Sequence, residues 1–182
     1  MHHPSILSCG EMLWDHFPAG PRFGGAPANF ACHAQLHGGR VTLLSAVGDD
    51  PRGHEATEIL CRFGLDTSLI QTIATAPTGA VGVSVDAAGK PSFEIHPNSA
   101  WDQIAWTPEL AARLADVDAL YFGTLGQRGA ISRATIRRAL AVATSLEVGI
   151  VGINEWRPLK PEIPFGGIKE SGIGVEGGHE GI

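Results

Sequence analysis

Short apolar runs alternate along the chain with longer segments whose apolar residues recur at helical spacing. The apolar runs have the length of buried strands, and they are residues 6–9, 12–14, 41–47 and 119–122. The segments with helical spacing are residues 27–36, 51–63, 107–114 and 132–144. Strands that alternate with helices of this length indicate βαβ units around a mostly parallel sheet, which is an α/β fold.

Capping residues mark the starts of three of these helices. Asp50 suits an N-cap and Pro51 the first helical position, Thr107 repeats this cap-plus-proline pattern, and Ser132 is the expected cap of the last helix. In the helix predicted from residue 27, the inward stripe consists of Phe30, Ala31, Ala34 and either Cys32 or Leu36.

Two further regions depart from this alternation. Residues 80–85 and 92–96 alternate apolar and polar positions around the turn-forming segment 87–90, which predicts a β-hairpin that can lie off the main sheet. Residues 148–153 could form one more strand. The prolines and glycines that follow leave little room for regular structure, so an irregular glycine-rich tail is expected.

Composition narrows the range of partners. The formal charge of −6 is spread along 182 residues without a basic block, which argues against a nucleic-acid partner. No apolar run approaches the ~18 residues of a membrane span, and the chain does not start like a secretory signal, so no membrane contact and a cytoplasmic location are expected. Cys9, Cys32 and Cys61 are too widely spaced for a disulfide framework and are expected to be reduced thiols.

Residues 15–29 hold a group suited to polyols. A Gly24-Gly25 corner has no Cβ and can adopt positive φ, so a hydroxylated ligand can approach its backbone. Asn29 follows one helical turn later and offers both a donor and an acceptor. Asp15 lies just past a strand, where its carboxylate could accept two hydroxyl hydrogens. This combination predicts a sugar site.

The same residues belong to a longer pattern. Its fixed positions are Gly24, Gly25, Pro27, Asn29, Ala31, Gly38 and Gly48. This pattern resembles the first signature of the PfkB family of carbohydrate kinases. The segments 10–15 and 99–104 are most similar to the family's fructokinase-like members, and the likeness covers about residues 5–145.

The resemblance implies a ribokinase-like (Rossmann-like) three-layer sandwich with a small β lid, whose strands fall at about 11–23 and 80–106. It implies ATP-dependent phosphorylation of a fructose-like sugar with Mg²⁺, and a possible homodimer through the lid. By resemblance, the sugar contacts are Asp15, Gly24, Gly25 and Asn29. A substrate-side loop is expected at Gly123–Arg128, which adds Gln127.

The family's second signature, a glycine-rich loop that ends in the catalytic aspartate, has no match in these 182 residues. We therefore expect a truncated kinase domain without catalytic residues, to which ATP and Mg²⁺ do not bind fully. No metal site is predicted either, because capping explains Asp50, and His33 and His37 lack a third ligand.

Residues 146–182 resemble something different, the C-terminal end of an aldehyde dehydrogenase. The likeness rests on residues 146–154 and 164–178, and it departs from the dehydrogenases at Val175. We interpret the chain as a chimera of a kinase part, residues 1–145, and a dehydrogenase-like tail, with the join at 141–147. A non-catalytic sugar-binding or dimerisation fragment is the alternative, and a dehydrogenase is supported by the tail alone.

Overall fold

The computed structural model describes residues 3–85, 91–143, 152–153, 165–166 and 175–176. Its centre is a sheet of five parallel strands in the order β5-β4-β1-β8-β9. These strands are β1 (Ser5–Cys9), β4 (Arg40–Gly48), β5 (Ile70–Ile73), β8 (Ala119–Phe122) and β9 (Gly152–Ile153). The order places β1 between β4 and β8, so the carboxyl end of β1 lies in the middle of the sheet.

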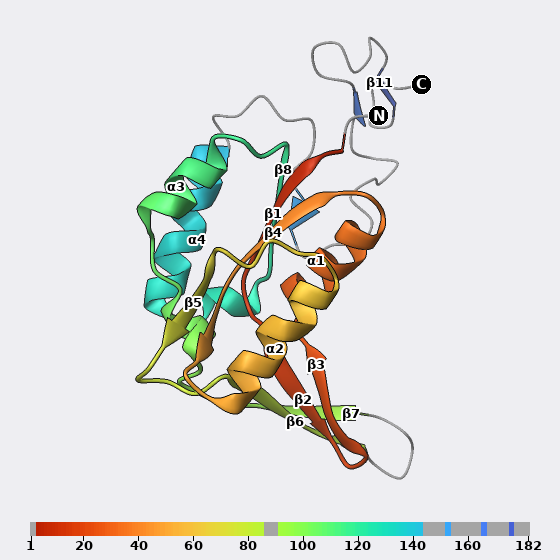
Figure 1. Cartoon of the computed structure of the whole chain (residues 1–182), viewed down its shortest axis with the longest axis vertical. Coiled ribbons are helices and arrows are strands. Elements are labelled where there is room, and N and C mark those ends of the chain that lie inside the picture. Colours follow the sequence, from red (N-terminus) through yellow and green to blue (C-terminus); the bar gives the residue numbers. More distant parts are fainter. Residues whose placement is uncertain (1–2, 86–90, 144–151, 154–164, 167–174, 177–182) are drawn as a thin grey trace.

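Helices cover both faces of this sheet (Figure 1). They are α1 (Ala26–Leu36), α2 (Pro51–Arg62), α3 (Pro108–Leu114) and α4 (Ala130–Ala143). Because side chains alternate along a strand, β4 contributes to two cores. Val41 and Leu43 pack with Ala31 of α1 and Leu60 of α2, while Leu44 packs on the other face among residues of α3 and α4. The predicted three-layer α/β sandwich is confirmed.

A second sheet of four strands, called the lid sheet here, lies at one end of the molecule (Figure 1). Its order is β3-β2-β6-β7, and its strands are β2 (Leu13–Phe17), β3 (Gly20–Gly24), β6 (Gly79–Val85) and β7 (Pro91–Ile95). The predicted hairpin is thus confirmed off the main sheet, while its turn at 87–90 lies outside the described residues. Past β7, residues 100–103 form the 3-10 helix η1 (Ala100–Gln103) and no strand.

Two of the three predicted caps are confirmed. The Asp50 carboxylate accepts from the Gly53 amide, 2.8 Å away, and the Thr107 hydroxyl accepts from the Leu110 amide. The prediction for Ser132 was wrong, because α4 begins at Ala130 and Ser132 is buried inside it.

The residue before α4, Gly129, lies against η1. The first helical bond runs from the Arg133 amide to the carbonyl of Gly129. A Cβ at Gly129 would stand only 2.5 Å from the carbonyl oxygen of Asp102 in η1. The glycine therefore lets η1 pack closely against the start of α4, and no local pattern reports that contact.

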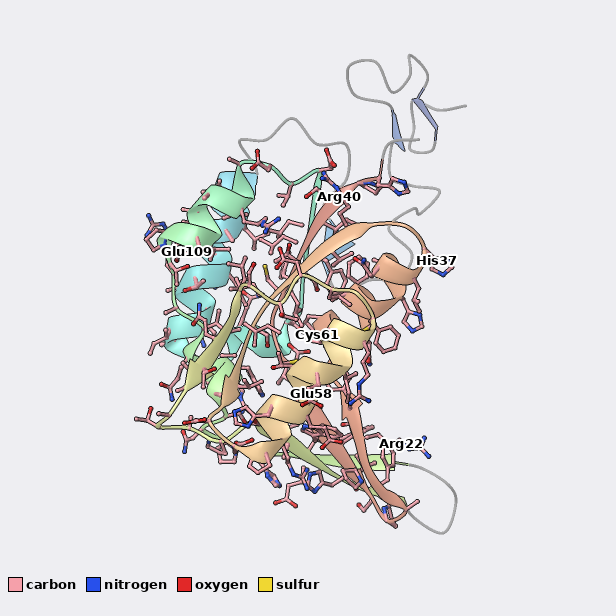
Figure 2. The ribbon with its side chains drawn as sticks, in the orientation of Figure 1. Arg22, His37, Arg40, Glu58, Cys61 and Glu109 are labelled. Carbon is pink, nitrogen blue, oxygen red and sulfur yellow. The ribbon has the colours of Figure 1, made fainter. Side chains whose placement is uncertain are left out.

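The stripe of α1 follows one of the two expected versions. Ala31 and Cys32 are buried, whereas Leu36 is 63% exposed, so the version with Leu36 was wrong. Phe30 stacks on Tyr121 of β8 with ring centroids 4.0 Å apart. All three cysteines are free thiols, Cys9 and Cys32 buried and Cys61 exposed on α2 (Figure 2).

Short elements were missed. The sequence analysis did not predict β5, which has four residues at the edge of the described sheet, or the 3-10 helices η1 and η2 (Leu125–Gln127). In the tail, β10 (Phe165–Gly166) pairs antiparallel with β11 (Val175–Glu176). Residues 148–151 of the predicted strand and the expected border at 145/146 lie outside the described residues.

Candidate functional site: a pocket between the central sheet and the lid sheet

A pocket of about 290 Å³ lies where the chain leaves β1 and β8. In parallel sheets the crevice beyond the carboxyl ends of the strands is the usual ligand site. Three parts of the fold contribute to this one: the strand ends with η2, the start of α1, and the inner face of the lid sheet. Its lining residues are Glu11, Leu13, Asp15, Gly25, Ala26, Asn29, Val81, Phe93, Ile95 and Leu125.

Asp15 reaches the pocket from β2, and Gly24 makes room for it. The two residues are close because Leu13 of β2 pairs with Gly24 of β3. A Cβ at Gly24 would stand 2.4 Å from Oδ2 of Asp15, so any other residue would displace the carboxylate. Burial raises the pKa of Asp15, and the charge of neighbouring His16 only partly opposes this. The carboxylate is therefore short of partners, as a ligand-binding acceptor would be.

Gly25 and Asn29 form the opposite wall. Gly25 has φ +105°, the positive φ that the sequence analysis allowed for, and a Cβ there would stand 2.5 Å from the carbonyl oxygen of Glu11. The contact that excludes a Cβ is thus with the protein's own backbone, and the expected approach of a ligand to Gly25 stays a prediction. The backbone N–H of Asn29 donates to the carbonyl of Gly25 at 2.9 Å, and this bond closes the first turn of α1. This turn places the Asn29 side chain in the same pocket as Asp15.

The structure thus brings Asp15, Gly25 and Asn29 together. Gly24 does not line the pocket itself, and it acts through the space that it leaves for Asp15. From the expected substrate-side loop, the pocket is lined by Leu125, whereas Gln127 is not among the lining residues. The assignment of sugar contacts to these positions stays a prediction.

Glu11 is a pocket residue that the sequence analysis did not single out. Its side chain is only 3% exposed, and Oε2 accepts from the Gly126 amide of η2 at 3.0 Å. Burial raises the pKa of Glu11, opposed by the nearby backbone amides and by the charge of Arg128. A lone glutamate after a strand carries no pattern, and only a buried position next to a predicted site could have drawn attention to it.

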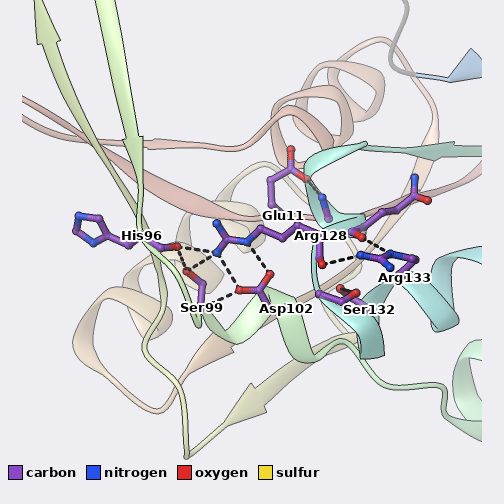
Figure 3. Close-up of polar contacts among 10 residues, drawn as sticks. Glu11, His96, Ser99, Asp102, Arg128, Ser132 and Arg133 are labelled. Carbon is purple, nitrogen blue, oxygen red and sulfur yellow. Dashed lines mark hydrogen bonds and ion pairs between the residues drawn. The ribbon is translucent and has the colours of Figure 1, made fainter.

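Arg128 fastens the end of the lid sheet to the loop after β8 (Figure 3). Its guanidinium makes a two-pronged ion pair with Asp102, with both nitrogen–oxygen distances at 2.8 Å. It also donates to the carbonyl of His96 at 2.6 Å and lies 3.9 Å from the ring centroid of the buried Trp101. These contacts hold the segment that follows β7 against η2, which supplies one wall of the pocket.

Asp50 holds the chain just before β6, at Thr78, as Arg128 holds the chain just after β7, at His96. Its Oδ2 accepts from the Thr78 amide and its Oδ1 from the Thr78 hydroxyl, both at 2.8 Å. The hydroxyl oxygen in turn accepts from the Gly48 amide at the end of β4. Burial alone would raise the pKa of Asp50, but the hydrogen bonds from Thr78 and Gly53 outweigh it and lower that pKa.

The remaining walls of the pocket are apolar. Val81, Phe93 and Ile95 come from the lid sheet, and Phe93 is 61% exposed although it is a large apolar side chain. Neither Lys nor Arg occurs among the described residues that line the pocket. Two carboxylates and one amide amid apolar walls suit hydroxyl groups on a carbon skeleton, and they repel anions.

Two other kinds of site are absent from the part of the chain that the structure describes. Among the described residues, no group of three or more His, Cys, Asp and Glu is placed to hold a metal ion. Within the same residues, no helix has both the length and the apolar character needed to span a bilayer.

Comparison with solved structures confirms the predicted ribokinase-like fold. The fructokinase from Xylella fastidiosa superposes with a TM-score of 0.70 at 24% identity, over 82% of this chain and 49% of that one. A sugar kinase from Pyrococcus horikoshii in complex with ATP superposes with a TM-score of 0.63 at 28% identity, over 81% of this chain and 51% of that one.

Curated relatives point the same way. Probable fructokinase-3 from Arabidopsis thaliana is 30% identical over 151 residues, which are 76% of this chain and 44% of the relative. The 5-dehydro-2-deoxygluconokinase of Lacticaseibacillus casei is 28% identical over 74% of this chain and 42% of the relative. The chain spans less than half the length of these two proteins.

Two families match the chain. The aldehyde dehydrogenase family matches residues 123–182, most of which lie outside the described residues. The pfkB family of carbohydrate kinases matches residues 20–151, well over half of the chain. The two matches overlap from 123 to 151, a stretch that includes the expected join, whose position stays a prediction. With the first signature, the fold and the relatives in agreement, the chain belongs to the pfkB family of carbohydrate kinases.

Proposed function

We propose that this chain binds a neutral, fructose-like sugar in the pocket between the central sheet and the lid sheet. The observation that carries the proposal is that Asp15 and Asn29, from different elements, line one pocket across the Gly24-Gly25 corner. A carboxylate accepts hydroxyl hydrogens, and an amide both donates and accepts, so together they match a pair of neighbouring hydroxyls. Each charge-assisted bond contributes about 1.5–3 kcal/mol when water is excluded.

The charge of the pocket favours a neutral sugar over a sugar acid. Glu11 and Asp15 line it, and the only basic group that lowers the pKa of Glu11, Arg128, is engaged with Asp102. A ligand carboxylate would meet like charge without a cation to pair with. The pocket chemistry therefore supports the fructokinase-like specificity among the relatives, rather than the gluconate-derived one.

The reaction to which we assign this pocket is ATP-dependent phosphorylation of the sugar. Fructokinases among the relatives and the ATP complex of the Pyrococcus horikoshii kinase support it. Phosphoryl transfer needs a nucleotide cradle and a residue that takes the hydroxyl proton. Because the second signature has no match in the 182 residues, we propose that this chain contributes the sugar-binding half, and that catalysis with Mg²⁺ and ATP requires residues beyond it.

Three further parts of the proposal concern partners and organisation. The exposed apolar residues Phe93 and Ile95 of β7 support pairing of two lid sheets in a homodimer. The match of the tail to aldehyde dehydrogenases supports a chimeric chain with its join near 145. Free thiols at all three cysteines suit the expected cytoplasmic location.

Isothermal titration of the full chain with fructose tests the proposal. We expect one site per chain with a Kd of ~1 mM or tighter, the range of ordinary enzyme substrates, and no measurable heat with gluconate. A coupled assay of ADP release should stay at background. Absence of heat with fructose and with other neutral hexoses would refute the binding proposal. Turnover at ~1–100 s⁻¹ would refute the proposal that catalysis requires residues beyond this chain.

A further inference from the structure

Glu11 occupies a place that three parts of the backbone build around it. It lies two residues past the end of β1, Gly126 of η2 donates to its Oε2, and the amide of Ala26 at the start of α1 is close enough to lower its pKa. The side chain therefore lies at the point where the strand end, the loop after β8 and α1 meet. Figure 3 shows Glu11 extending to this loop.

Two glycines of the loop after β8 leave the space that the Glu11 carboxylate occupies. A Cβ at Gly123 would stand 2.7 Å from Oε2 of Glu11, and one at Gly126 would stand 2.9 Å from the Cα of Gly10. Real Cβ atoms do not approach so closely, so larger residues at either position would push the loop away from Glu11. The close approach of the bare backbone is what brings the Gly126 amide within hydrogen-bonding distance.

Among the described residues, one hydrogen bond to the Glu11 carboxylate is found, from the Gly126 amide to Oε2 at 3.0 Å. An ionised carboxylate has about four acceptor sites. The backbone amides that act on Glu11 are three, its own and those of Ala26 and Gly126. The group lines the pocket, and burial still raises its pKa despite these amides. Burying a charge costs free energy, and the backbone amides offset this cost only in part, so a ligand hydroxyl would add a further donor to Glu11.

We infer that Glu11 is a further sugar-binding residue, whose remaining acceptor receives a hydroxyl hydrogen of the substrate beside those bound by Asp15. The inference rests on the proposed function, and it deepens it by assigning a second acidic contact. Such a contact requires a hydroxyl on the ligand at a defined place. It also couples sugar binding to the loop after β8, because the same carboxylate holds Gly126.

The test compares Glu11→Gln with wild type in the full chain, with Glu55→Gln as matched control. Glu55 is exposed on α2 and does not line the pocket. Fructose affinity at pH 7 should fall about 10–100-fold in E11Q, the effect of losing one charge-assisted hydrogen bond, and should not change in E55Q. Thermal unfolding with and without fructose separates lost affinity from lost folding.

A panel of monodeoxy fructoses supplies a readout that a structural role would not move. Removal of one particular hydroxyl from the sugar should weaken its binding to wild type about tenfold more than its binding to E11Q. The reason is that E11Q already lacks the carboxylate that bonds this hydroxyl. Affinity of the wild type should also fall as pH drops through the raised pKa of Glu11, and less so in E11Q. Asp15, Tyr121 and Arg128 are the other titratable groups around the pocket or acting on Glu11.

The outcomes separate the two claims. If E11Q binds fructose and every deoxy sugar as wild type does, or only lowers the melting temperature, the inference is overturned while the proposed function stands. If wild type binds no neutral sugar, both are overturned. If E11Q weakens fructose binding and loses the response to one hydroxyl, both are supported.

Discussion

Asp15 in the pocket and Asp50 at the base of the lid sheet are carboxylates with opposite surroundings. Asp50 accepts hydrogen bonds from Gly53 and from both the amide and the hydroxyl of Thr78, and its pKa is lowered. Asp15 is short of such partners, and burial raises its pKa. A carboxylate with both oxygens bonded within the protein therefore stabilises the fold, whereas one with few bonds is available to a ligand.

The same contrast extends to whole regions. The lid attachment, defined here as Asp50, Thr78, Asp102 and Arg128, pairs its charges within the protein. The pocket instead turns the carboxylates of Glu11 and Asp15 toward a space lined by apolar side chains. Changes in the attachment should therefore affect stability first, and changes in the pocket should affect sugar affinity first.

The largest effect is expected from Arg128→Ala in the attachment. It removes the two-pronged pair with Asp102 and the contact with Trp101, and it leaves a mostly buried carboxylate unpaired. The free energy of unfolding should fall by about 2–4 kcal/mol. Urea unfolding followed by tryptophan fluorescence measures it. Arg137→Ala, an exposed change on α4, should stay within about 0.5 kcal/mol, and equal midpoints for the two variants would contradict the role of Arg128.

Next in size is Asp15→Asn in the pocket. Fructose affinity should fall about 10–100-fold, because an amide cannot accept two hydroxyl hydrogens with the strength of a carboxylate. Stability at pH 7 should not decrease, since the substitution removes a partly buried charge. Titration calorimetry and thermal unfolding of one preparation measure both. If D15N lost stability while its folded fraction kept the affinity of wild type, Asp15 would be a structural residue like Asp50, and the comparison would be wrong.

A smaller loss of stability is expected from Asp50→Ala, about 1–2 kcal/mol, because it deletes the N-cap of α2 and the bonds to Thr78. The neighbouring Asp49→Ala is the matched control. Asp49 has a 65% exposed side chain and only a 3.6 Å contact to exposed His54, so its effect should stay below about 0.5 kcal/mol. Equal effects at the two positions would show that the attachment does not depend on Asp50.

The smallest effect concerns pH. A lowered pKa in the folded state means that the contribution of Asp50 is present above its unfolded value of about 3.9 and is lost as pH falls below it. For Asp15 the sign is reversed: with a raised folded pKa, stability from this group rises as pH falls toward 4. The gain of Asp15→Asn over wild type, under about 1 kcal/mol, should therefore shrink between pH 7 and pH 4 in parallel urea titrations. A constant gain would contradict a raised pKa.

Much of the fold could be predicted because its signals are local. The pattern Asp50-Pro51 predicts a helix start that the structure has at the same residue, and the alternating segments 80–85 and 92–96 predict β6 and β7. Asp15 and Asn29 could be selected as candidate site residues because a long signature surrounds them. In each case the residues that decide the outcome lie within a few positions of one another.

Predictions failed where distant segments decide. Ser132 was predicted as a cap, but α4 begins at Ala130, next to a glycine that lies against the distant segment η1. For Gly24 the expected contact with a ligand stays a prediction, and what the sequence did not indicate is that this glycine leaves space for the carboxylate of Asp15 across a strand pair. Glu11 lies in the segment 10–15 that resembles fructokinases, but its contact with Gly126, which is 115 positions away, is not visible in that segment.

The sequence alone determined the alternation of strands and helices, the caps of α2 and α3 and the glycine corner, because chain stereochemistry and hydrophobic periodicity act between neighbours. Which carboxylates are hydrogen-bonded within the protein and which line the pocket depends on folding, because folding brings in distant partners such as Thr78 and Gly126. Burial and hydrogen bonding across the fold set the charge state of each group, and local sequence does not encode them.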